Sequence, residues 1–145
     1  MFADFIKRLT QSAADPLTET DARLALSALL VRVARTDGDY AADEIIRIDR
    51  ILEARYELSN DDAKALRRDA EILEGHAPDT VRFTRAIKDK VPYEDRVSVV
   101  EALWQVALAD GVRDDEEDAL LRLAANLLGV NDRDSNLARQ RVTGK

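Results

Sequence analysis

The sequence predicts an all-α protein, a compact bundle of seven to eight helices with an internal two-fold repeat. Ala, Leu, Arg, Glu and Asp dominate the chain, and this composition favours helix over sheet. Five Gly and three Pro in 145 residues leave little room for turns, which indicates long elements with few connections. Because 46% of the residues are hydrophobic, we expect a single domain, residues 1–145, with a substantial core.

The N-terminal part of the chain predicts three helices. Apolar side chains at helical spacing predict an amphipathic helix at 2–14, within an N-terminal segment 1–16 that Pro16 ends. The second helix, at 19–36, is apolar nearly all round in its middle, which is typical of a helix in the centre of a bundle. A stripe of isoleucine and leucine predicts the third helix at 42–56.

Three further helices are expected in the middle of the chain. Ser59 suits the N-cap of a helix at 60–74, because its side chain can accept a hydrogen bond from the first turn. Helices at 78–90 and 93–109 each begin at or directly after a proline, which is compatible with the first helical turn. The helix at 93–109 is again apolar nearly all round, so we expect it to pack against 19–36.

Two helices complete the predicted bundle. Leucine and alanine at helical spacing predict a helix at 114–128, which Gly129 ends. Asn131 and Asp132 can cap a last short helix at 132–141.

A short sequence motif, the repeated phrase, occurs twice, at residues 34–44 and 107–117. Both copies fit the pattern A-x-x-D-G-x-x-x-x-[DE]-E, each between a nearly all-apolar helix and an amphipathic one. The matched positions are Ala34/Ala107, Asp37/Asp110, Gly38/Gly111, Asp43/Glu116 and Glu44/Glu117, at a constant offset of 73 residues. If the two apolar helices pack together, the two turns lie at the same end of the molecule.

Helix geometry alone accounts for the glycines and glutamates of the phrase. Gly38 and Gly111 fall where a helix ends, and glycine adopts the left-handed conformation of such a turn without penalty. Glu44 and Glu117 fall in the first turn of the next helix, where negative charge meets the positive end of the helix dipole.

The aspartates of the phrase are not explained in this way. Asp37 and Asp110 fall at the last turn of a helix, against the negative end of the dipole, which costs roughly 0.3–1 kcal/mol if nothing compensates. A bound cation would compensate, because carboxylate and carbonyl oxygens form hard-cation sites. A plain helix–turn–helix is the alternative, since Asp-Gly is a common turn dipeptide. The phrase does not follow the ligand spacing of an EF-hand loop.

The doubled phrase resembles the TerB-like tellurite-resistance family. The resemblance covers residues 20–130, and it is closest at 101–111, which includes Trp104, and at 127–130. It implies an all-helical bundle, a small cytoplasmic bacterial protein with an acidic metal-binding surface, and a role in tellurite and stress resistance within larger assemblies. Carried over to this sequence, the resemblance implies Asp37, Glu44, Asp110 and Glu117 as the candidate metal ligands, flanked by Asp43 and Glu116. Asp43 departs from the glutamate that the family pattern has there.

Composition disfavours several other classes of function. The net charge of −7 and the absence of a basic run disfavour nucleic-acid binding. No apolar run approaches the length of a membrane helix, and no signal peptide is evident, so we expect a cytoplasmic protein. The chain has no cysteine and a single histidine, His76. It has neither a Glu-x-x-His pair nor a Gly-rich phosphate loop, so we do not expect an enzyme.

Two hypotheses about function follow. The first is a non-catalytic protein of the tellurite or stress-resistance type that binds a divalent metal ion through the two acidic turns. The second is a protein–protein interaction module whose acids are only solvated surface and whose N-terminal amphipathic helix contacts a partner, in a complex or peripherally at a membrane. Under either hypothesis, the expected partners are other protein components of a stress or tellurite-resistance assembly.

Overall fold

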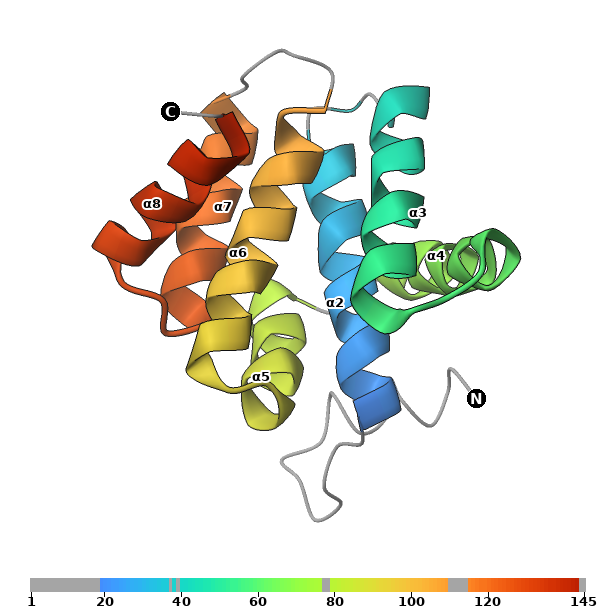
Figure 1. Ribbon diagram of the computed structural model, residues 1–145, viewed down its shortest axis with the longest axis horizontal. Coiled ribbons are helices and arrows are strands. Elements are labelled where there is room, and N and C mark those ends of the chain that lie inside the picture. Colours follow the sequence, from blue (N-terminus) through green and yellow to red (C-terminus); the bar gives the residue numbers. More distant parts are fainter. Residues whose placement is uncertain (1–18, 37, 39, 77–78, 110–114, 144–145) are drawn as a thin grey trace.

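The computed structural model describes residues 19–36, 38, 40–76, 79–109 and 115–143, which form seven helices and no strand (Figure 1). The helices are α2 (Glu19–Arg35), α3 (Ala42–Tyr56), α4 (Asn60–Gly75), α5 (Thr80–Lys90), α6 (Tyr93–Ala107), α7 (Asp115–Leu127) and α8 (Asp132–Thr143). The predicted all-α class is confirmed. The helix predicted at 2–14, within the N-terminal segment 1–16, lies outside the described residues.

Helix α2 occupies the centre of the bundle, as its all-round apolar sequence predicts. It contacts α3, α4, α5, α6 and α7, and its leucines Leu26, Leu29 and Leu30 are fully buried. Helix α6 is the second buried helix, packs against α2, and places Trp104 in the core. Although these two helices are the most apolar, no helix in the described ranges has the length and apolar character needed to cross a bilayer.

Local caps explain most helix boundaries. Ser59 Oγ accepts a 3.1 Å hydrogen bond from the Asp62 amide at the start of α4, and Gly129 ends α7 with a φ of +76°. The start of α5 differs from the prediction at 78. Asp79 is the N-cap, its Oδ1 accepting a 2.9 Å hydrogen bond from the Arg82 amide, so the helix begins at Thr80.

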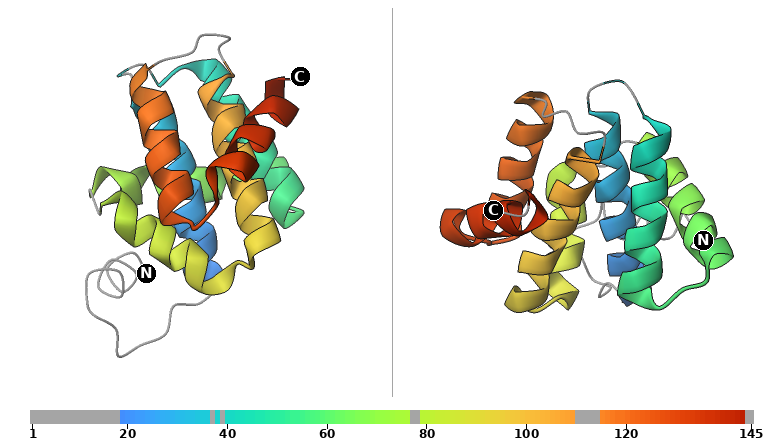
Figure 2. Two further views of the ribbon diagram at one scale, coloured as in Figure 1. Left: turned by 90° about the vertical axis from the view of Figure 1, so that its left-hand side faces the viewer. Right: turned by 45° about the horizontal axis from the view of Figure 1, so that its top comes forward.

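Each acidic segment of the repeated phrase (residues 37–44 and 110–117) connects two helices, and the connected helix ends lie at one end of the bundle (Figure 1). In Figures 1 and 2, α2 and α6 finish at the same end of the molecule, and α3 and α7 begin there. The contacts follow a similar order in both halves, because α2 packs against α3 and α4, and α6 packs against α7 and α8. This arrangement agrees with the expected internal two-fold repeat, which stays a prediction.

Candidate functional site

Two glutamates at this shared end are buried. Glu44 is the third residue of α3 and Glu117 the third residue of α7, and their exposed fractions are 0% and 1%. The Oε2 atom of each carboxylate is also shielded from solvent. A glutamate that only balances a helix dipole can do so from the surface. Both copies of the repeated phrase therefore place their last glutamate inside the protein, which dipole compensation alone does not require.

The start of α3 shows what one oxygen of Glu44 does. The N-cap residue is Ala41, whose side chain has no hydrogen-bonding group. Glu44 Oε1 instead accepts a 3.1 Å hydrogen bond from the Ala41 backbone N–H, as the glutamate of a capping box does. The role in helix initiation expected for Glu44 is thus confirmed.

The other acids of the repeated phrase differ in their surroundings. Asp43 and Glu116, the flanking acids, are exposed. Asp37 and Asp110 lie outside the described residues, so the structure locates only two of the four predicted ligands. Within the described ranges, no three acidic or histidine side chains gather closely enough to hold a metal ion. Gly38 has the predicted left-handed conformation, with a φ of +82°.

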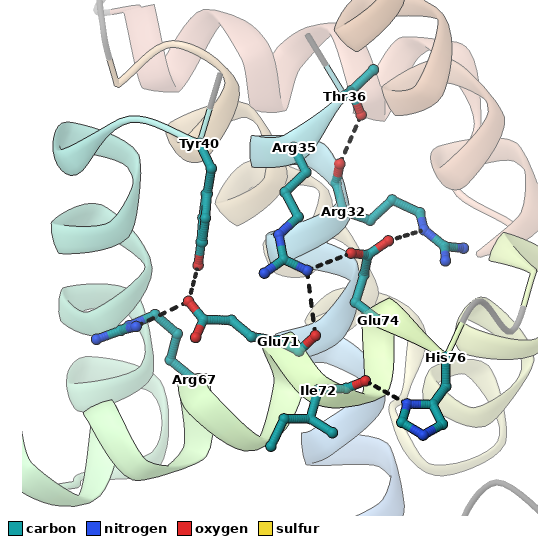
Figure 3. Close-up of polar contacts among 9 residues, drawn as sticks. All are labelled: Arg32, Arg35, Thr36, Tyr40, Arg67, Glu71, Ile72, Glu74 and His76. Atoms are coloured by element: carbon teal, nitrogen blue, oxygen red, sulfur yellow. Dashed lines mark hydrogen bonds and ion pairs between the residues drawn. The ribbon is translucent and has the colours of Figure 1, made fainter. Parts of the chain in front are cut away.

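A polar network holds the segment that leads into α3 (Figure 3). The Tyr40 hydroxyl donates a 2.6 Å hydrogen bond to Glu71 Oε2 on α4, and the same oxygen accepts a 3.0 Å bond from Arg67 Nη1. Burial, and then the hydrogen bond to Glu71, raise the pKa of the Tyr40 hydroxyl above its usual value. Tyr40 therefore stays protonated and acts as a hydrogen-bond donor at neutral pH.

Arg67 extends this network back to α3. Its Nε donates a 2.6 Å hydrogen bond to Asp49 Oδ1, and Asp49 is almost fully buried. Burial acts to lower the pKa of Arg67, but the hydrogen bonds to Asp49 and Glu71 outweigh it and raise that pKa. The guanidinium remains charged and links α3 to α4, next to the segment that contains Tyr40.

A second ion-pair group holds the end of α2. Glu74 on α4 contacts Arg32 Nε at 3.2 Å and Arg35 Nη1 at 2.8 Å, with Glu74 and Arg32 mostly buried. The Arg35 guanidinium carbon also lies 4.9 Å from the centroid of the Tyr40 ring. Residues on both sides of position 37 therefore form hydrogen bonds or ion pairs with α4, and this helix supports the first acidic segment (Figure 3).

These contacts of α4 with the first acidic segment and the end of α2 were not predicted from the sequence. One local signal was present, because Arg67 and Glu71 are four residues apart on one helix and form an ion pair. The second copy of the phrase cannot repeat the first arrangement, since Arg35 is replaced by Leu108 at the equivalent position. The second copy therefore lacks the arginine that contacts Glu74 in the first copy, although the last glutamate of each copy is buried.

The only histidine of the chain has a structural contact. His76 is exposed at the end of α4, and its Nδ1 lies 2.9 Å from the carbonyl oxygen of Ile72 (Figure 3). That the protein is not an enzyme stays a prediction.

Comparison with known proteins agrees with the helical architecture and with the family resemblance of the sequence. The family model described as tellurite resistance protein TerB matches residues 23–140. The chain belongs to the TerB family. This TerB-family chain also resembles the crystal structure of a protein of unknown function from Porphyromonas gingivalis W83, with a TM-score of 0.64, 20% identity, and coverage of 92% of this chain and 96% of that one. That likeness shows a shared fold. No curated protein sequence matches the chain.

Proposed function

We propose that this TerB-family protein is a non-catalytic protein of tellurite or stress resistance that binds a divalent cation between its two acidic segments. One observation carries the proposal. Glu44 and Glu117 hold the same position in their helices, those helices begin at the same end of the bundle, and both carboxylates are buried. The ligands we propose are these two glutamates together with Asp37 and Asp110.

The electrostatics of this end support a cation. Burying a carboxylate costs several kcal/mol unless other groups compensate, on the order of the effective penalty for any buried ion. The helix dipoles and the Ala41 N–H offset part of this cost for Glu44. A divalent ion shared by both segments would add a favourable charge interaction for Glu44 and Glu117 at once. The exposed acids Asp43 and Glu116 would raise the local concentration of cations.

The ligand atoms available at this end of the bundle define the kind of metal ion. Carboxylate oxygens suit hard cations such as Ca²⁺, Mg²⁺ and Mn²⁺, whereas Zn²⁺ sites generally use histidine or cysteine. The chain has no cysteine, and its only histidine, His76, caps α4. We therefore expect an oxygen-coordinated ion.

The alternative function, a solvated acidic surface that contacts a protein partner, has a different observation in its favour. Asp43 and Glu116 are exposed, as that alternative requires. The burial of Glu44 and Glu117 favours the metal site, because a solvated surface does not need buried carboxylates.

Calorimetric titration with Ca²⁺, Mg²⁺, Mn²⁺ and Zn²⁺ tests the metal proposal. We expect saturable heat with at least one hard cation and an affinity at least about tenfold lower in E44Q, in E117Q and in the double variant D37N/D110N. The double variant D61N/D62N is the matched control, because it removes two exposed acids from the first turn of α4. Its affinity should equal that of the wild type. Equal, negligible heats for the wild type and D37N/D110N would contradict the proposal.

A further inference from the structure

A pocket opens on the side of the bundle formed by α6, α7 and α8. Its volume is about 310 Å³, which suits a small molecule or ion with its hydration shell. The lining residues are Trp104, Arg122, Ala125, Asp132, Ser135, Asn136 and Arg139. Trp104 comes from α6, and the other lining residues come from the later turns of α7 and from α8, whereas Glu117 lies in the first turn of α7. The pocket is thus a different site from the acidic segments.

Two arginines give this pocket its charge. Arg122 on α7 and Arg139 on α8 both line it, and within the described part of the chain neither forms an ion pair with an acidic side chain. This is notable in a chain with 29 acidic and 22 basic residues. Elsewhere, Arg32, Arg67 and Arg141 are each paired with a carboxylate. Two guanidinium groups that line a common cavity, with no carboxylate partner among the described residues, offer their donors to a ligand.

The remaining walls suit a ligand that carries an oxyanion. The guanidinium carbon of Arg139 lies 6.0 Å from the centroid of the Trp104 ring, so the indole helps to hold that arginine at the wall. Ser135 and Asn136 add a hydroxyl and an amide to the same lining. Arginine presents donors in a planar fork that matches phosphate and carboxylate oxygens.

We propose that the α6–α7–α8 pocket binds a small multivalent oxyanion, held between the guanidinium groups of Arg122 and Arg139 next to Trp104. This site is independent of the proposed cation site, and either could exist without the other. Asp132 is the one acid among the described residues that line the pocket, so its carboxylate opposes an anion and limits the affinity. The proposal thus requires that arginine and aspartate variants act in opposite directions.

The fluorescence of Trp104 provides a direct test, because it is the only tryptophan of the chain and lines the pocket. The full-length protein is titrated at constant ionic strength with inorganic phosphate, citrate and tellurite, and affinities are confirmed by calorimetry because Arg139 itself contacts the indole. We expect a saturable change below about 10 mM with at least one of them. The anion that binds most tightly then distinguishes phosphate, carboxylate and inorganic oxyanion ligands.

Variants separate the pocket from a general effect of charge. R122Q and R139Q should each weaken binding at least about tenfold, because each removes charge-assisted hydrogen bonds. D132N should strengthen it. R133Q is the matched control, since Arg133 is exposed on α8 outside the lining, and its affinity should equal that of the wild type. Absence of saturable binding by all three anions, or equal weakening in R133Q, R122Q and R139Q, would overturn the proposal.

Discussion

The Tyr40 hydroxyl donates a 2.6 Å hydrogen bond to Glu71 Oε2, across 31 positions of sequence. This contact joins the segment between α2 and α3 to the C-terminal half of α4 (Figure 3). Because Glu71 also accepts from Arg67, and Arg67 donates to the buried Asp49, the segment is connected to both α3 and α4. The first acidic segment therefore rests on a support whose strength can be measured.

Replacing Tyr40 with Phe should lower the free energy of unfolding at neutral pH by about 1 kcal/mol, the usual value of one hydrogen bond. The difference from the wild type should depend on pH. Since the folded-state pKa of Tyr40 is raised, its contribution is complete below the unfolded-state pKa near 10 and declines as pH rises above it. Urea unfolding of both proteins between about pH 8 and pH 11 measures this difference. A difference that stays constant over that range would contradict the proposed ionisation.

Replacing Glu74 with Gln should destabilise the protein by about 1–2 kcal/mol, because one mostly buried carboxylate serves both Arg32 and Arg35. E101Q is the matched control. The Glu101–Arg141 pair has a similar separation, 3.0 Å, but its side chains are 31% and 50% exposed. Loss of the Glu101–Arg141 pair should lower the free energy of unfolding by no more than about 0.5 kcal/mol, as for other exposed pairs. Chemical denaturation compares the two variants, and equal losses would show that burial does not strengthen the Glu74 pairs.

The helices were predicted from sequence features that lie within a few residues of each helix boundary. The bounds of α3 agree with the sequence at both ends, and Ser59 caps α4 as expected. Capping, helix-ending glycines and apolar spacing act over one or two turns, so they can be read without the tertiary structure. The start of α5 was predicted two residues early because Pro78 and Asp79 are both plausible at a helix start, and the Asp79 side chain forms the cap.

The supports of the candidate site could not be predicted in this way. Tyr40 and Glu71 are brought together by the packing of α4 against α2 and α3, and no local pattern specifies that packing. The burial of Glu44 and Glu117 was missed for a related reason. An acid in the first helical turn is favourable whether it is buried or exposed, so the sequence pattern is the same in both cases. Only the fold distinguishes Glu44 from its exposed neighbour Asp43.

Deleting residues 1–14 should abolish capture of a partner protein if the N-terminal segment contacts one. Thermal stability should be nearly unchanged, because the core cluster of the described residues extends from Ala25 to Ala138. A variant in which residues 2–14 are scrambled at constant composition controls for charge and apolar content. Pull-down with the three proteins measures capture, and capture by the deletion variant at the wild-type level would rule out a contact through this segment.

Gly38 and Gly75 form a matched pair, because a methyl group added at either would meet no atom within 4 Å. Gly38 has a φ of +82°, where a side chain strains the backbone, so G38A should destabilise the protein by about 1 kcal/mol. Gly75 is the last residue of α4 and has no such φ, so G75A should stabilise by roughly 0.4–1 kcal/mol by restricting the unfolded chain. Urea denaturation gives both values. Because the two changes add the same methyl group, their opposite signs would isolate the left-handed turn that follows Asp37 as the reason for glycine there. Stabilisation by both would instead show that the turn does not need glycine.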